Sequence, residues 1–141
     1  MKAIVLALAI IGLTAATPMA TNAPLGTPKI EFKEMMYDFG DIKEGDQAKH
    51  EFVFTNTGDA PLILTEVKPS CNCTTPEWPK QPIMPGKSDK IIAIFDSKGR
   101  PGEFNKSIEV FSNATKEPII ITMKGNAKPK LDADPEGPKF E

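Results

Sequence analysis

Apolar and polar residues alternate in several short segments between residues 30 and 124. The clearest is AKHEFVFT at 48–55, in which Phe52 and Phe54 share one face. Such alternation is typical of a strand that buries one face and exposes the other. Similar segments occur at residues 30–32, 37–42, 61–67, 90–96, 104–111 and 119–124. The pattern therefore predicts about seven short strands.

Turn-forming residues separate these segments. The sequence NTGD at 56–59 predicts a tight hairpin turn, because asparagine and glycine tolerate the positive φ that such turns require. A long loop at 68–88 contains five prolines, and its TTP at 74–76 is typical of a short edge strand. No segment has a convincing helical pattern. Turns about every 8 to 12 residues favour an all-β, immunoglobulin-like antiparallel sandwich, with a small barrel as the alternative.

The predicted core consists of the apolar residues that share the alternation within each segment. They are Phe32, Phe39, Phe52, Phe54, Leu62, Leu64, Ile92, Ile94, Ile108, Val110, Ile119 and Ile121. No internal repeat is visible, and the length of the chain suits one domain. We therefore expect a single immunoglobulin-like domain at residues 24–127.

The two ends of the chain differ from this domain in composition. Residues 1–23 begin with one lysine, continue with an uncharged apolar run at 3–13, and end in small residues. This order predicts a secretory signal peptide rather than a membrane anchor, because the run is too short to span a bilayer comfortably. The candidate cleavage positions are Ala16, Ala20 and Ala23. Residues 128–141 carry three prolines and alternating charge, which predicts a disordered tail.

Export and charge narrow the range of partners. A cleaved signal peptide places the protein in the periplasm or outside the cell, with no membrane span left after cleavage. The formal net charge is -2, and no stripe of lysine or arginine is present. A nucleic-acid partner is therefore not expected, because phosphate binding needs a basic surface.

Four segments of the chain resemble one known family. They are DFG-x-I-x-x-G at 38–45, F-x-F-x-N-x-G-x-x-PL-x-L-x-x-V-x-x-SC-x-CT at 52–74, P-I-x-PG at 82–86 and D-x-x-x-R-x-G-x-F-x-K-x-I-x-V-x-SN at 96–113. Together they resemble the bacterial exported family named domain of unknown function 1573, over roughly residues 30–127. Asn72 stands where that family usually has glycine, and asparagine is the next most tolerant residue of positive φ.

The resemblance implies an immunoglobulin-like sandwich in a secreted or periplasmic protein, similar to domains of the hydin and abnormal-spindle type. That family has no assigned activity, so the resemblance implies no enzyme and no cofactor. Proteins with such folds most often bind other proteins. We therefore predict a non-catalytic binding or accessory module of the cell envelope. Its expected partner is another envelope or secreted protein.

Both cysteines of the chain, Cys71 and Cys73, lie in the long loop. Export places them in an oxidising compartment. A disulfide between them requires the chain to bend at Asn72, because the Cα atoms of a disulfide lie about 4.4–6.8 Å apart. A closed loop of about three residues contributes only about 1.6 kcal/mol, so this disulfide would be a weak staple and comparatively easy to reduce. A structural pair and a labile redox disulfide both fit these residues.

A soft-metal site is the third interpretation of the cysteine pair. Two thiolates can start a copper(I) site, but they cannot close a tetrahedral zinc site. His50 and Met84 would have to supply further ligands, and a single C-x-C is a weak metal signal. His50 is the single histidine, and its place at a strand start indicates a position on the rim of the sandwich. No catalytic constellation is recognisable around it, so we predict that the protein is not an enzyme.

Trp78 and Arg100 are candidates for a protein-binding loop. Tryptophan and arginine dominate protein interfaces, and binding residues concentrate on loops held by a rigid scaffold. We expect Trp78 to lie near the cysteines, and the segment 69–85 to be the binding surface. The structural alternatives are that Trp78 covers one end of the sandwich and that Arg100 pairs with the Asp96 carboxylate.

Overall fold

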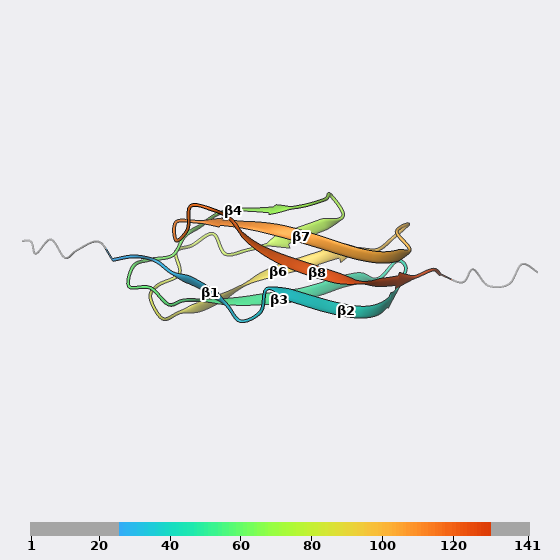
Figure 1. The fold of residues 1–141 in the computed structure, drawn as a ribbon, viewed down its shortest axis with the longest axis horizontal. Helices are drawn as coiled ribbons and strands as arrows, with labels where there is room; N and C mark the ends of the chain where they lie inside the picture. The colour runs from blue at the N-terminus through green and yellow to red at the C-terminus, as the bar shows by residue number, and fades with distance from the viewer. Residues whose placement is uncertain (1–25, 131–141) are drawn as a thin grey trace, which may run out of the picture.

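The computed structural model of the protein describes residues 26–130 (Figure 1). Eight strands make up its regular structure: β1 (Ile30–Phe32), β2 (Met36–Lys43), β3 (Gln47–Asn56), β4 (Leu64–Pro69), β5 (Thr74–Glu77), β6 (Ser88–Asp96), β7 (Gly102–Ser112) and β8 (Ile119–Lys128). No helix long and apolar enough to cross a membrane occurs in the described part of the chain. The expected signal peptide at 1–23 lies outside the described residues. So do residues 131–141 of the expected tail, and both stay predictions.

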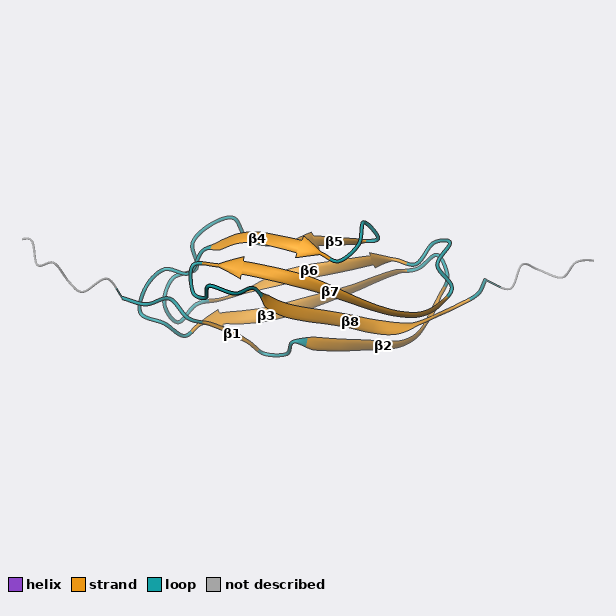
Figure 2. Cartoon of the chain, turned by 45° about the horizontal axis from the view of Figure 1, so that its top comes forward, coloured by secondary structure: helices purple, strands orange, loops and turns teal. Residues whose placement is uncertain are grey.

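The strands form two sheets that pack face to face (Figure 2). Sheet A has the order β1-β3-β6-β5, and sheet B has the order β2-β8-β7-β4. The predicted all-β sandwich is therefore confirmed, with eight strands instead of about seven. Neighbouring strands are antiparallel, as expected, except that the edge strand β2 runs parallel to β8.

The connection from β3 to β4 differs from the predicted hairpin. β3 lies in sheet A and β4 in sheet B, so the chain crosses between the sheets after Asn56. Gly58 is required here for space rather than for positive φ, because a Cβ at this position would collide with the backbone of Thr27 and Lys29. The N-terminal lead-in thus packs directly on the crossing, which local turn chemistry alone does not predict.

Large apolar side chains from both sheets fill the space between them. Seven predicted core residues are buried, namely Phe52, Phe54, Leu62, Leu64, Ile108, Val110 and Ile121. Phe32, Phe39 and Ile119 are only partly buried, because they lie toward the open sides or ends of the sandwich. The dense centre of the core thus comes from the inner strands and from the chain that follows Asn56.

The predicted inward face of β6 is wrong. Ile91 and Phe95 are fully buried, whereas Ile92 and Ile94 lie half-buried on the outer face of sheet A. The segment KIIAIFD has apolar residues in both registers, so alternation alone does not choose between them. Phe95 decides the register, because its ring stacks on Phe104 with the centroids 4.3 Å apart. This choice buries the largest side chain of the strand.

Two buried polar side chains fasten opposite ends of the sandwich. Asn56 is fully buried, and its Nδ2 donates to the carbonyl oxygens of Ala60 at 2.8 Å and Ile83 at 2.9 Å. At the other end, the Ser97 hydroxyl donates to the carbonyl oxygen of Asp46 at 2.6 Å. Each side chain joins segments far apart in sequence, so both ends of the sandwich are held by more than strand pairing.

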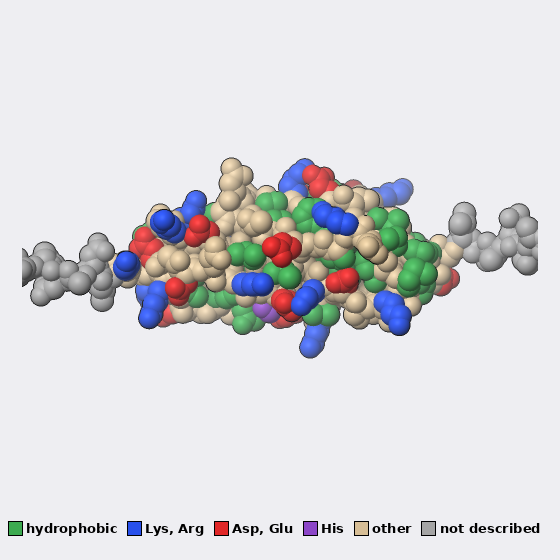
Figure 3. Space-filling view, turned by 180° about the vertical axis from the view of Figure 1, so that it is seen from behind, with side chains coloured by type: hydrophobic (Ala, Val, Ile, Leu, Met, Phe, Trp, Pro, Cys, Tyr) green, Lys and Arg blue, Asp and Glu red, His purple; other side chains and the backbone are tan. Residues whose placement is uncertain are grey.

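The outer surface carries charges of both signs. In Figure 3 lysine and arginine side chains alternate with acidic ones, and neither sign gathers in one patch of the face shown. The exposed pair Lys90 and Glu51, whose Nζ and Oε1 atoms lie 2.8 Å apart, is typical of this mixing. Charges of opposite sign are therefore neighbours on this face.

Candidate functional site

Cys71 and Cys73 lie in the turn that carries the chain from β4, at one edge of sheet B, to β5, at the adjacent edge of sheet A. They are joined as a disulfide, with their Cα atoms 5.3 Å apart. The bend expected at Asn72 is present, because the N–H of Thr74 donates to the carbonyl oxygen of Cys71 at 3.3 Å. A tight turn thus brings the two sulfurs together.

The two ends of this turn are held by the sheets. The Ser70 N–H donates to the Ser107 carbonyl oxygen at 2.9 Å, and the Ser107 N–H donates to Ser70 Oγ at 3.2 Å. On the other side, the Asp96 N–H donates to the Cys73 carbonyl oxygen at 2.9 Å. Cys73 is only 8 % exposed and belongs to the core, whereas Cys71 is half-buried at the core surface. The two sulfurs therefore differ in access to solvent.

Trp78 does not lie beside the cysteines. Cys73 precedes β5 and Trp78 follows it, so the extended strand separates them by about 16 Å. The indole packs half-buried against the core, and the Lys80 Nζ lies 3.0 Å from its centroid. Trp78 thus covers the edge of the sandwich while its ring holds a cation at the surface.

Arg100 lies at the end of the sandwich that carries the disulfide. Its Nη1 donates to the carbonyl oxygens of Lys98 at 2.9 Å and Asp96 at 3.4 Å. The expected pairing with the Asp96 carboxylate is wrong, because Arg100 bonds to the backbone carbonyl oxygen of Asp96, while an oxygen of the carboxylate accepts the Lys98 N–H at 3.0 Å. Arg100 thus folds back onto its own turn. It does not join Trp78 in one binding surface.

His50 points toward the core from the middle of β3, between aromatic rings. Its imidazole stacks on Tyr37 with the centroids 3.6 Å apart, and meets the edge of Phe52 at 4.8 Å. Its Nε2 lies 2.9 Å from Glu34 Oε1, and the side chain is 17 % exposed. The ring therefore fills the side of the sandwich between β2 and β3, as a packing residue with one polar contact.

The four residues of the copper hypothesis are not brought together. Met84 lies near Asn56, because Gly86 and Lys87 of its turn bond to that residue. Cys73 lies beside Asp96, at the far end of β6. The length of that strand separates Met84 from the disulfide by roughly 25 Å. Among residues 26–130, no group of three or more His, Cys, Asp or Glu side chains is placed to hold a metal ion.

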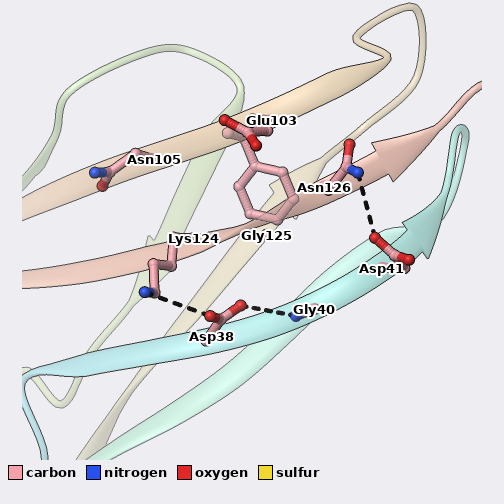
Figure 4. A pocket seen from close by; sticks show the side chains of 9 residues that line it. Asp38, Gly40, Asp41, Glu103, Asn105, Lys124, Gly125 and Asn126 are labelled. Atoms are coloured by element: carbon pink, nitrogen blue, oxygen red, sulfur yellow. Dashed lines mark hydrogen bonds and ion pairs between the residues drawn. The ribbon is translucent and has the colours of Figure 1, made fainter.

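A polar groove of about 660 Å³ crosses the outer face of sheet B over β2, β8 and β7 (Figure 4). Gly125 lines it at a point where no side chain would fit, because a Cβ there would lie 2.7 Å from the Phe104 ring and 2.9 Å from the Gly40 carbonyl oxygen. Several of its polar groups are paired with one another: Lys124 Nζ lies 3.4 Å from Asp38 Oδ2, and the Asn126 amide donates to Asp41 at 3.3 Å. The lining thus combines paired polar groups with the exposed Glu103 side chain.

The DFG segment of β2 explains the rim of this groove. The strand has a bulge between Asp38 and Asp41, and Gly40 takes the positive φ of 63° within it. Asp38 Oδ1 accepts the Gly40 N–H at 2.8 Å. This bond, with a smaller contribution from the Lys124 ammonium, holds the pKa of the Asp38 carboxyl below its ordinary value. The motif therefore encodes a backbone feature.

An exposed apolar surface is the feature that sequence patterns missed. Leu62 and Ile83 are both buried and exchange two backbone hydrogen bonds, of 2.9 and 2.8 Å. Their neighbours in this antiparallel bridge point to the opposite side, outward. These neighbours are Pro61, Ile63, Pro82 and Met84, all exposed, and we call them the Ile63–Met84 surface. Leu62 and Ile83 are too far apart in sequence for a periodic pattern to connect them, so the sequence did not predict this pairing.

Solved structures resemble the fold of this chain. A protein of unknown function from Porphyromonas gingivalis W83 is 22 % identical with a TM-score of 0.60, over 77 % of this chain and 50 % of that protein. The ASH/PapD-like domain 7 of human CEP192 is 14 % identical with a TM-score of 0.58, over 88 % of this chain and 99 % of that domain. These likenesses confirm the predicted immunoglobulin-like class of the sandwich.

A region of similar fold also occurs in an enzyme. A family 123 glycoside hydrolase from Clostridium perfringens is 12 % identical with a TM-score of 0.55, over 72 % of this chain and 27 % of that enzyme. The chain thus spans only a part of several proteins that it resembles, including about half of the Porphyromonas gingivalis protein. At such identities the likeness concerns the fold alone.

The family is shown by the sequence itself. A comparison with curated proteins finds no match. The model of one family, however, matches residues 30–127, which run from the first residue of β1 to the penultimate residue of β8. An immunoglobulin-like domain in a family without assigned activity is consistent with a non-catalytic module. The chain belongs to the family described as "Protein of unknown function (DUF1573)".

Proposed function

We propose that the protein is an exported, non-catalytic binding module of the cell envelope, and that it binds another envelope or secreted protein through the Ile63–Met84 surface. The observation that carries this proposal is the outward apolar face of the Leu62–Ile83 bridge. Met84 is 55 % exposed and Ile63 is 40 % exposed. Apolar side chains that gather at one exposed site favour a protein contact.

The backbone beneath this surface is held by several hydrogen bonds. Leu62 and Ile83 are bonded to each other and buried, and the Asn56 side chain donates to the Ile83 carbonyl oxygen at 2.9 Å. Asn113 adds a further clamp, because its side chain accepts the Ile63 N–H at 2.9 Å. A surface held in this way loses little conformational entropy when a partner binds. It also includes part of the segment 69–85 in which a binding loop was expected.

Capture from the native compartment tests the proposal. The mature protein is immobilised with a cross-linker and exposed to envelope and secreted fractions from the same cells. Met84→Glu should lose the specifically captured protein, since a carboxylate would be buried unpaired at the contact. Met36→Glu is the matched control, because Met36 is also 55 % exposed but lies on β2. Equal capture by Met84→Glu and the unchanged protein would contradict the proposal.

Trp78→Ala separates this surface from the wider loop. Trp78 is half-buried against the core at the edge of the sandwich. Reduced capture by the Trp78→Ala variant would show that the partner also covers that edge. Export is tested independently by N-terminal sequencing of the protein recovered from each fraction. The sequence predicts a start after Ala16, Ala20 or Ala23, and recovery only with Met1 present would argue against export.

A further inference from the structure

The disulfide between Cys71 and Cys73 is asymmetric in its surroundings. Cys73 is 8 % exposed and packs within the core cluster, whereas Cys71 is half-buried at the cluster surface. Thiol–disulfide exchange requires an attacking thiolate to reach one sulfur in line with the bond that breaks. Because the Cys73 side is covered by the core, Cys71 Sγ is the sulfur that solvent thiols can approach.

We propose that Cys71 is the entry site for thiol–disulfide exchange with an external thiolate, either a small-molecule thiol or the thiol of another protein. The incoming sulfur forms a bond to Cys71 Sγ, and the Cys71–Cys73 bond breaks. The electron pair of that bond leaves on Cys73 Sγ, which takes up a proton from solvent. The incoming thiol is oxidised into a mixed disulfide on Cys71, and Cys73 is reduced to a thiol.

The loop geometry makes this exchange compatible with an intact fold. The cross-link closes a loop with one residue between the cysteines, so it restricts the unfolded chain little. The segments on both sides remain bonded to the sheets without it, through Ser70 to Ser107 and through Cys73 to Asp96. Cys73 stays beside Cys71 after opening and can attack the mixed disulfide, so the modification is reversible. The site is therefore suited to reversible covalent attachment at the end of the sandwich.

Two single variants of the full chain test the entry site. Cys73→Ser keeps only the Cys71 thiol, and Cys71→Ser keeps only the Cys73 thiol. In the folded state, the Cys71 thiol should react with an aromatic disulfide at least about tenfold faster than the Cys73 thiol, since access governs the rate. In denaturant the two rates should become similar. A Cys73 thiol that reacts as fast as Cys71 in folded protein would overturn the proposal.

The unchanged protein provides a test that does not depend on variants. Oxidised protein is incubated with millimolar glutathione, quenched with acid, and digested for mass spectrometry. A glutathione adduct on Cys71 supports the proposal, whereas an adduct on Cys73, or an intact disulfide after several hours, overturns it. A reduced thioredoxin-type protein at equal thiolate concentration distinguishes the source. If that protein opens the disulfide faster, the external thiolate is that of a protein. If glutathione opens it faster, the external thiolate is that of a small molecule.

Discussion

At the scale of single residues, the positions that carry the family resemblance encode backbone geometry. Gly40 in the DFG segment takes a positive φ within a bulge. Asn56 in the F-x-N-x-G segment is a buried clamp, and Asn113 in the terminal SN bonds both the N–H of Ile63 and the carbonyl oxygen of Pro61. These residues specify how segments meet. The motifs therefore identify a fold. Residues that carry function are expected among the exposed side chains instead.

Asn56→Ala should lower the free energy of unfolding by about 2–4 kcal/mol. The variant removes the side-chain partner of the Ala60 carbonyl oxygen and of the Gly58 N–H, and one of two bonds to the Ile83 carbonyl oxygen. A buried group left without a partner costs about 1–3 kcal/mol. Urea denaturation followed by circular dichroism measures the change. Asn105→Ala, at an exposed position of β7, is the control and should change stability by less than about 0.5 kcal/mol. Equal effects of the two variants would refute the clamp.

Asp38 should titrate below an ordinary aspartate in an NMR pH series. Its pKa is lowered from 3.8 chiefly by the Gly40 N–H and secondarily by Lys124. Because the folded pKa lies below the unfolded value, the carboxylate adds stability above about pH 4 and loses it as the pH falls through the folded pKa. Lys124→Met should leave most of the shift in place. A return to the ordinary value in that variant would assign the shift to Lys124 instead.

At the scale of elements, the sequence was sufficient to locate the strands, because alternation and turn residues are local signals. It was not sufficient for β6, where both registers are apolar and the choice depends on Phe104 from another strand. The hairpin predicted after Asn56 was wrong for a similar reason, because Gly58 packs against the N-terminal lead-in. The Ile63–Met84 surface likewise arises from a bridge between distant segments. Long-range contacts decide these features, and no local pattern reports them.

The register of β6 gives a prediction with an internal control. Ile91 is fully buried and Ile92 is half-buried on the outer face. Ile91→Ala should cost about 3–4 kcal/mol of unfolding free energy, because it removes core contacts and leaves a cavity. Ile92→Ala removes the same atoms from the surface and should cost about 1 kcal/mol or less. A larger loss for Ile92→Ala than for Ile91→Ala in urea denaturation would mean that the strand lies in the register predicted from the sequence.

At the scale of the whole molecule, the two ends of the sandwich carry different structural features. The described chain enters and leaves at opposite ends of the long axis (Figure 1). One end carries the Ser97 clamp and the exchangeable disulfide, and the other carries the Asn56 clamp and the apolar surface. The packed core and the two sheets lie between these ends and separate the disulfide from the apolar surface. A change at the disulfide should therefore leave the apolar surface in place.

Removal of the disulfide tests that independence. The double variant Cys71→Ser/Cys73→Ser should unfold in one cooperative transition, with a midpoint about 6–13 °C below that of the oxidised protein. A closed loop of about three residues contributes about 1.6 kcal/mol, and each kcal/mol shifts the midpoint of a domain of this size by about 4–8 °C. Differential scanning calorimetry measures both the midpoint and the cooperativity. Reduced unchanged protein should match the variant. Loss of the cooperative transition in both would show that the sandwich depends on this bond, and that exchange at Cys71 cannot occur without unfolding.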